Sequence, residues 1–138
     1  MVDQRLSIPR YWRRMPPQYY RLEGVQCVKC GRIYFPPRAV CECGSREFKP
    51  YPLPSTGKLL NFTVLYSVPV EFEKMKPLII GVVDLGGVKV VGQIVDCMNP
   101  PEKLSPGIDV EVVFRMVKMD GTYGLINYGY KFRPINNC

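Results

Sequence analysis

Hydrophobic and polar residues alternate along much of the second half of this 138-residue chain. The alternation covers residues 61–68 and 110–116, and a period of two residues is typical of strands that are buried on one face. Two apolar runs, 78–85 and 88–95, flank Gly86-Gly87, a dipeptide that favours a tight β-hairpin. A fifth strand is expected over residues 123–132. The pattern therefore predicts an almost entirely β second half.

Five short strands marked by glycine turns favour a small barrel of the oligonucleotide/oligosaccharide-binding (OB) type. The N-terminal region has a different pattern: residues 7–15 are predicted to form a short helix capped by Ser7, and a helical turn is expected over 17–20. The fold class is therefore mainly β, with short N-terminal helices, a small ribbon that carries the paired cysteines described below, and a five-stranded OB-fold barrel. Three segments are expected: an N-terminal helical segment (1–21), a zinc ribbon (22–50) and an OB-fold domain (51–138).

Four of the six cysteines form two closely spaced pairs, and a glycine follows each pair directly. These residues are Cys27, Cys30, Cys41 and Cys43. The chain contains no histidine, so a site of the zinc-ribbon kind has to use cysteine alone. Short strands at 32–35 and 38–40, on either side of Pro36-Pro37, are expected to bring the two pairs together. A structural four-thiolate metal site is therefore predicted.

Alternatives to a zinc site remain open. The second pair is one residue shorter than the usual C-x-x-C, which is also compatible with a ribbon that has lost its metal, and tetrahedral sulfur suits iron as well as zinc. A secreted disulfide framework is disfavoured because the first residues show no signal-like apolar centre. Cys97 and Cys138 stand apart from the pairs. Cys97 ends an apolar strand and is expected to be a buried thiol, and Cys138 is expected to have no role.

The net charge of +7 is distributed unevenly along the chain. Residues 1–50 carry ten Lys/Arg against four Asp/Glu, whereas residues 51–138 carry nine against eight. The basic surface therefore belongs to the first third, where it attracts phosphate groups or an acidic protein patch. No apolar stretch approaches the ~20 residues that a membrane helix requires, and a cytoplasmic location is expected.

A set of short motifs spans nearly the whole chain. They are Pro9-Arg-Tyr-Trp-Arg-Arg14, Tyr20-Arg-Leu-x-Gly24, the two cysteine pairs, Tyr34-Phe-Pro-Pro-Arg38 and Tyr128-Gly-Tyr-Lys-Phe-Arg-Pro134. Together they resemble the acyl-CoA-associated family with a rubredoxin-like zinc ribbon and an OB-fold. The resemblance implies a non-catalytic partner of thiolase-type enzymes. The archaeal members, which this chain resembles most, bridge acetoacetyl-CoA thiolase to hydroxymethylglutaryl-CoA synthase at the start of the mevalonate pathway.

Such a role requires side chains that hold coenzyme A or an enzyme surface, and the first third of the chain supplies them. Guanidinium groups pair with phosphates or carboxylates, while aromatic rings stack on adenine or fill a groove in a partner. The candidates for CoA binding or partner contact are Arg10, Tyr11, Trp12, Arg13, Arg14, Tyr19, Tyr34, Phe35 and Arg38. The alternative is that the aromatics pack the N-terminal helix onto the ribbon and that Arg38 is a solvated hairpin arginine.

Two other classes of function, nucleic-acid binding and catalysis, are compatible with parts of the sequence. OB-folds and zinc ribbons also occur in nucleic-acid-binding proteins, but between Leu78 and Val95 there is no aromatic residue and only Lys89 is basic. Catalysis by this chain alone is disfavoured because it has no histidine as a general base. A redox role for Cys27 and Cys30 would need a βαβ context that the pattern lacks. A non-catalytic scaffold is favoured, and nucleic-acid binding is the alternative.

Overall fold

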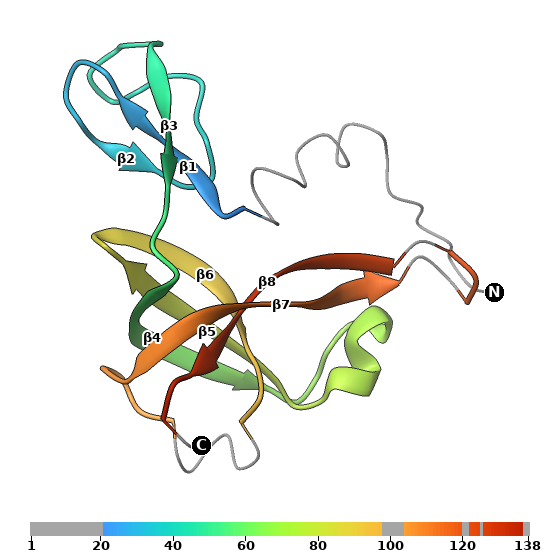
Figure 1. Cartoon of the computed structure of the whole chain (residues 1–138). Helices are drawn as coiled ribbons and strands as arrows, with labels where there is room; N and C mark the ends of the chain where they lie inside the picture. The colour runs from blue at the N-terminus through green and yellow to red at the C-terminus, as the bar shows by residue number, and fades with distance from the viewer. Residues whose placement is uncertain (1–20, 98–103, 120–121, 125, 137–138) are drawn as a thin grey trace.

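The computed structural model describes residues 21–97, 104–119, 122–124 and 126–136. Two β-sheets make up this part of the chain: a three-stranded ribbon and a closed five-stranded barrel (Figure 1). The mainly β fold with a ribbon and a barrel is thus confirmed. The helices expected at 7–15 and 17–20 lie outside the described residues. Among the described residues, no helix has the length and apolar character needed to cross a membrane.

The ribbon is an antiparallel sheet with strand order β2-β1-β3. Its strands are β1 (Glu23–Cys27), β2 (Ile33–Tyr34) and β3 (Phe48–Pro52). The strand predicted at 38–40 is wrong, because this segment leads into the turn that holds the second cysteine pair. Strand β3 was not predicted, and it contains two prolines, Pro50 and Pro52. It lies at the edge of the sheet and pairs only with β1, a position at which prolines are tolerated because one side of the strand has no partner to which to donate.

The barrel has the strand order β4-β5-β6-β8-β7 and closes through pairing of β4 with β7. Its strands are β4 (Thr56–Leu65), β5 (Leu78–Leu85), β6 (Val88–Ile94), β7 (Asp109–Met119) and β8 (Ile126–Pro134). A short 3₁₀ helix, η2 (Val70–Met75), connects β4 to β5. Consecutive strands pair as antiparallel neighbours, except that β6 meets β8 in a short parallel contact. This closed order is that of an OB-fold.

Phe132 on β8 is the largest fully buried side chain of the barrel. Its ring occupies the space left by Gly92 on β6, where an added Cβ atom would lie only 2.4 Å from the ring carbon Cε2. The backbone closes the barrel at the same point, because the Val95 N–H donates to the Phe132 carbonyl at 2.8 Å. Leu59, Val83 and Leu85, all fully buried, complete the core around this ring.

The ribbon packs directly onto the barrel. Phe35, just after β2, meets Tyr130 of β8 edge to face, with ring centroids 5.9 Å apart. Ile33 and Leu53 also pack against the barrel core, and Leu22, 4% exposed, belongs to that core. Apolar side chains before, within and after the ribbon strands therefore hold the ribbon against the barrel.

Cys97 is disulfide-bonded, so the prediction of a buried free thiol at this position is wrong. The four ribbon cysteines are free. Sequence spacing cannot reveal such a pairing, because it depends on which segments the fold brings together. Cys138 lies outside the described residues.

Substituting Gly92 by alanine should destabilise the barrel by about 1–3 kcal/mol, because the added methyl group collides with a ring that has no exposed surface and no space into which to move. Chemical denaturation measures this as a lower free energy of unfolding. The control is Val91→Ala on the adjacent, 59% exposed residue, with an expected loss below about 1 kcal/mol. Equal losses for both variants would show that the barrel does not depend on this close approach.

Candidate metal centre and exposed surfaces

The four ribbon cysteines converge on one point. Their sulfur atoms all lie within 4.8 Å of one another. The Sγ atoms of Cys27 and Cys43 are 3.7 Å apart, and those of Cys30 and Cys41 are 3.3 Å apart. A tetrahedral site with metal–sulfur bonds of about 2.3 Å places its sulfurs roughly 3.8 Å apart. The donor set and its spacing therefore fit a four-coordinate metal ion, and these four residues would hold it.

The two turns that carry the cysteines have the same construction despite their different lengths. In the first, the Gly31 N–H donates to the Cys27 carbonyl at 3.0 Å. In the second, the Gly44 N–H donates to the Cys41 carbonyl at 2.9 Å, which closes a loop shorter by one residue. Both glycines have positive φ, 74° and 85°, a conformation that glycine adopts without strain. The shortened pair thus completes the cluster through a tighter turn of the same kind.

The cluster has a protected side and an exposed side. Cys27 and Cys41 are 1% and 3% exposed, whereas Cys30 and Cys43 lie at the surface. The Tyr34 hydroxyl lies 3.3 Å from the Cys41 Sγ, within hydrogen-bonding distance. Because such an outer group orients a ligand and stabilises its negative charge, Tyr34 supports the cluster as well as belonging to the ribbon sheet.

The protein environment favours ionisation of some of these thiols over others. The Tyr34 hydroxyl, together with a backbone N–H of the second turn, lowers the pKa of Cys41 to about 6. The backbone N–H of Cys30 lowers the pKa of Cys27. The Arg32 N–H acts to lower the pKa of Cys30. The contact between the Cys30 and Cys41 sulfurs is the main opposing cause, and the pKa of Cys30 is raised to about 12. Four thiolates this close repel one another, and a bound cation would relieve that repulsion.

The other predicted site residues divide into two groups. Tyr34, Phe35 and Arg38 are described, and they do not share one open slot: Tyr34 contacts the cysteine cluster and Phe35 contacts the barrel. The Arg38 guanidinium lies over the Tyr34 ring, 4.8 Å from its centroid, and 3.9 Å from a Glu42 carboxylate oxygen. The remaining candidates lie outside the described residues: Arg10, Tyr11, Trp12, Arg13, Arg14 and Tyr19.

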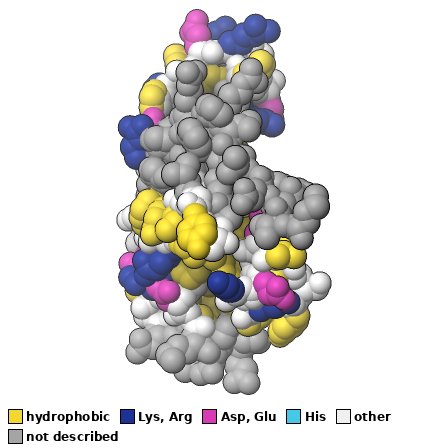
Figure 2. Space-filling model, turned by 90° about the vertical axis from the view of Figure 1, so that its right-hand side faces the viewer, with side chains coloured by type: hydrophobic (Ala, Val, Ile, Leu, Met, Phe, Trp, Pro, Cys, Tyr) yellow, Lys and Arg dark blue, Asp and Glu magenta, His cyan; other side chains and the backbone are white. Residues whose placement is uncertain are grey.

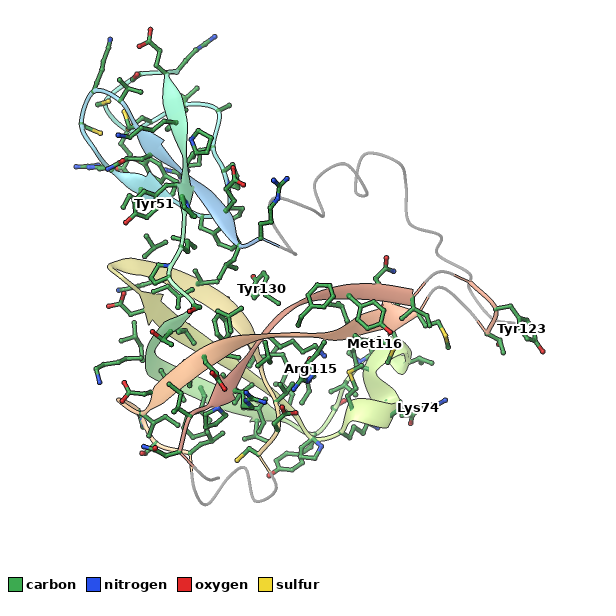
Figure 3. The ribbon with its side chains drawn as sticks, in the orientation of Figure 1. Tyr51, Lys74, Arg115, Met116, Tyr123 and Tyr130 are labelled. Atoms are coloured by element: carbon green, nitrogen blue, oxygen red, sulfur yellow. The ribbon has the colours of Figure 1, made fainter. Side chains whose placement is uncertain are left out.

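The structure adds a surface that the sequence did not reveal. Strands β7 and β8 run beyond the barrel as a two-stranded arm, here called the hairpin arm and comprising residues 114–119 and 126–130 (Figures 1 and 3). One face of the arm carries large apolar side chains that are 40–51% exposed: Phe114, Met116, Met119, Ile126 and Tyr128. This set is called the apolar face. Beyond its end, Tyr123 is 99% exposed.

The strand register explains why these side chains lie together. Met116 is opposite Tyr128, and Met119 is opposite Ile126, so each pair projects to the same side of the arm. A bulge between Met116 and Lys118 inserts one residue and keeps Met119 on the same side as Met116. The signal available in the sequence was the large apolar residues at alternating positions, Phe114 with Met116 and Ile126 with Tyr128.

Comparison with known proteins places both parts of the chain. Residues 16–49 match the domain family described as ChsH2, rubredoxin-like zinc ribbon domain, and residues 50–115 match ChsH2, C-terminal OB-fold domain. A benzoylsuccinyl-CoA thiolase subunit BbsA of Thauera aromatica is 29% identical and aligns over 83% of this chain and 76% of its own. A solved structure described as the Ltp2-ChsH2(DUF35) aldolase superposes with a TM-score of 0.71 at 25% identity, covering 96% of this chain and 100% of that chain.

A DUF35 domain-containing scaffold protein of Methanocaldococcus jannaschii is similar over nearly the full length. The two sequences are 43% identical over 133 residues, which is 94% of this chain and 92% of the relative. The matched domain families correspond to the ribbon, which in this chain carries the four-cysteine cluster, and to the OB barrel. The chain therefore belongs to the family of DUF35 domain-containing scaffold proteins.

Proposed function

We propose that this protein is a non-catalytic scaffold that bridges acetoacetyl-CoA thiolase and hydroxymethylglutaryl-CoA synthase, and that it helps to hold acyl-CoA while the intermediate passes between them in the mevalonate pathway. Relatives named as scaffold proteins support the non-catalytic role. The similarity to a benzoylsuccinyl-CoA thiolase subunit supports a partner of the thiolase type. In the ribbon, a zinc ion on the four cysteines would stabilise the fold rather than take part in a reaction.

The apolar face of the hairpin arm is the observation that carries this proposal. A contiguous set of exposed aromatic, methionine and isoleucine side chains is costly in water and typical of a protein–protein contact. Phe114 and Tyr128 stack with centroids 5.6 Å apart, which gives the face a flat, rigid centre. Figure 2 views the molecule from the side toward which the arm points and shows hydrophobic side chains gathered above Lys, Arg, Asp and Glu side chains.

A bridge needs a second surface, and the ribbon supplies one of different character. Between residues 21 and 52 the chain has six Lys/Arg and three Glu. Lys29, Arg46 and Lys49 are exposed there. The ribbon lies at one end of the molecule (Figure 1). We assign this basic surface, with the arginines and aromatics of residues 10–19, to the phosphates of CoA or an acidic patch on the second enzyme.

The physical purpose of such a bridge is to keep acetoacetyl-CoA close to the enzyme that consumes it. Condensation of two acetyl-CoA molecules to acetoacetyl-CoA runs uphill, so the product reverts unless the next enzyme consumes it. Holding both enzymes on one scaffold raises the effective concentration of the intermediate at the second site. The scaffold itself needs no catalytic group for this effect.

The surface of the β5–β6 hairpin supports this assignment over nucleic-acid binding. Its exposed side chains include Lys89 and Val91, and neither strand offers an aromatic ring on which a base could stack. Exposed aromatics occur just after β4, at Tyr66, and on the hairpin arm, where Phe114 and Tyr128 lie beside methionine and isoleucine. That combination suits a protein partner better than a phosphate backbone.

The purified protein is expected to contain about one zinc ion per chain, and Cys30→Ser should lose it. Cys30 is exposed, so its replacement removes a ligand without leaving a buried cavity. Elemental analysis measures zinc and iron together, and hydrogen exchange should report faster exchange in residues 22–49 while the barrel stays protected. Val28→Ser, at a 57% exposed position in the same turn, is the control and should keep its metal. Wild-type protein with well under half an equivalent of any metal contradicts the prediction.

The double variant Met119→Lys/Ile126→Glu should weaken binding of the thiolase at least tenfold. The two new charges lie directly opposite each other and have opposite signs, so the arm keeps its cross-strand pairing while two of the five side chains of the apolar face become charged. Binding is measured by calorimetry with each purified enzyme, and coupled flux from acetyl-CoA to hydroxymethylglutaryl-CoA is measured with both enzymes present.

The control for this experiment is Val91→Lys, which places a charge at a 59% exposed apolar position on β6, away from the arm. It should bind both enzymes like the wild type, and both variants should melt within a few degrees of the wild type. Coupled flux should fall when the protein is omitted or the double variant is used, although each enzyme alone keeps its activity. Undiminished binding and flux with the double variant would show that the arm is not the enzyme contact.

A further inference from the structure

A pocket of about 520 Å³ opens at the base of the hairpin arm, and the proposed function assigns no role to its charged lining. Its walls come from the end of η2, the start of β5, the end of β6, and strands β7 and β8. Figure 3 shows Arg115 and Met116 of β7 beside the 3₁₀ helix η2, at this side of the barrel. Met75, Ile79 and Ile94 give the pocket an apolar lining.

A buried lysine lies in this apolar lining. Lys131 on β8 lines the pocket and is only 5% exposed. Its ammonium group has three N–H donors, but among the described residues the contact found for it is the thioether sulfur of Met75, at 3.9 Å. A thioether is a weak acceptor, and no ion pair joins Lys131 to a carboxylate in the described part of the chain. A buried ammonium in this state lacks the oxygen acceptor that normally accompanies a buried charge.

The neighbouring charged side chains do not compensate the positive charge of Lys131. Lys76 and Arg115 also line the pocket, whereas Asp96 is the acidic residue among its lining side chains. Asp96 is already engaged, because its carboxylate lies 2.8 Å from the Arg115 guanidinium and 3.7 Å from that of Arg133. Burial, with a smaller contribution from the positive charge of Arg115, lowers the pKa of Lys131. Lys76 has its own partner, because its Nζ lies 3.4 Å from a Glu73 carboxylate oxygen. The uncompensated positive charge of the pocket is therefore that of the buried Lys131.

The strand register shows that this charge is focused on one side of the sheet. Lys131 on β8 is opposite Val113 on β7, and Arg115 lies two residues after Val113 on β7. The Lys131 and Arg115 side chains therefore project to the same face of the β7–β8 pair. The apolar face of the arm is on the opposite side. The cationic pocket and the apolar face meet at Met116, which belongs to the apolar face and also lines the pocket.

We propose that this pocket binds a small organic carboxylate, with its carboxylate group accepting hydrogen bonds from Lys131 and its aliphatic body against Met75, Ile79 and Ile94. A carboxylate supplies the missing oxygen acceptor and the compensating negative charge. The volume exceeds what a bare inorganic anion fills, and the apolar lining does not replace the hydration that a phosphate dianion loses. The fit therefore favours an amphipathic anion with one charged end.

The test uses sodium butyrate as the probe and the methyl signal of Met75 as the reporter. Full-length protein with ¹³C-labelled methionine methyl groups is titrated with butyrate, and sodium chloride keeps the ionic strength constant. The Met75 signal should shift and saturate, because the aliphatic chain of the ligand lies against this side chain. Inorganic phosphate, titrated in the same way, should bind at least fivefold more weakly.

The variant Lys131→Met should lose at least tenfold in butyrate affinity, and Lys131→Gln should show a similar loss. Lys89→Met, which removes an exposed lysine from β6, should bind like the wild type. Thermal unfolding separates loss of the site from loss of the fold, because replacing an unpaired buried ammonium with an apolar side chain of similar size should not lower the melting temperature. No saturable shift, unchanged binding by both Lys131 variants, or phosphate binding as tight as butyrate would each overturn the proposal.

Discussion

The packing of Phe132 against the bare backbone of Gly92 is the contact from which the rest of this structure is organised. The ring fills the centre of the barrel, and the carbonyl of the same residue joins β8 to β6 through Val95. The two residues before it in the chain act on either side of this point. Tyr130 packs against Phe35 of the ribbon, and Lys131 enters the pocket. Residues 130–132 of β8 thus contact the ribbon, the pocket and the barrel core in turn.

Patterning predicted the parts of the fold that depend on local chemistry. Strand β5 has the bounds expected from its apolar run, and β6 differs by one residue, since Gly86-Gly87 fixes the turn between them. Strand β4 was predicted too late in the chain. A register shift between Leu59 and Asn61 changes which residues face inward, and a strict two-residue period cannot follow such a shift. Strand β3 was missed because prolines usually indicate a loop. They are compatible with a strand only at the edge of a sheet, and the sequence does not show that β3 lies there.

The candidate sites differ in the same way. The cysteine cluster could be predicted because each pair is close in sequence and only the meeting of two turns had to be inferred. Strand β8 shows the limit of this reasoning, because Lys131 and Phe132 are adjacent in sequence yet both are buried. Alternation assigns neighbours to opposite faces and would expose one of them. At the closure of a curved barrel one side faces the core and the other faces η2, so both are covered.

The hairpin arm then connects the two surfaces that sequence reasoning missed. Its strands carry the apolar face on one side and the pocket side chains Lys131 and Arg115 on the other. Near the base of the arm, the ion pair of Arg133 with Glu111 joins β8 to β7, and that of Arg115 with Asp96 joins β7 to the segment that follows β6. Each is partly exposed and contributes little stability alone, but together they restrict the direction in which the arm leaves the barrel. An anion held between Lys131 and η2 would touch these same strands. Its binding free energy would then be linked to the orientation of the arm, and so to the apolar face that we assign to the enzyme partner.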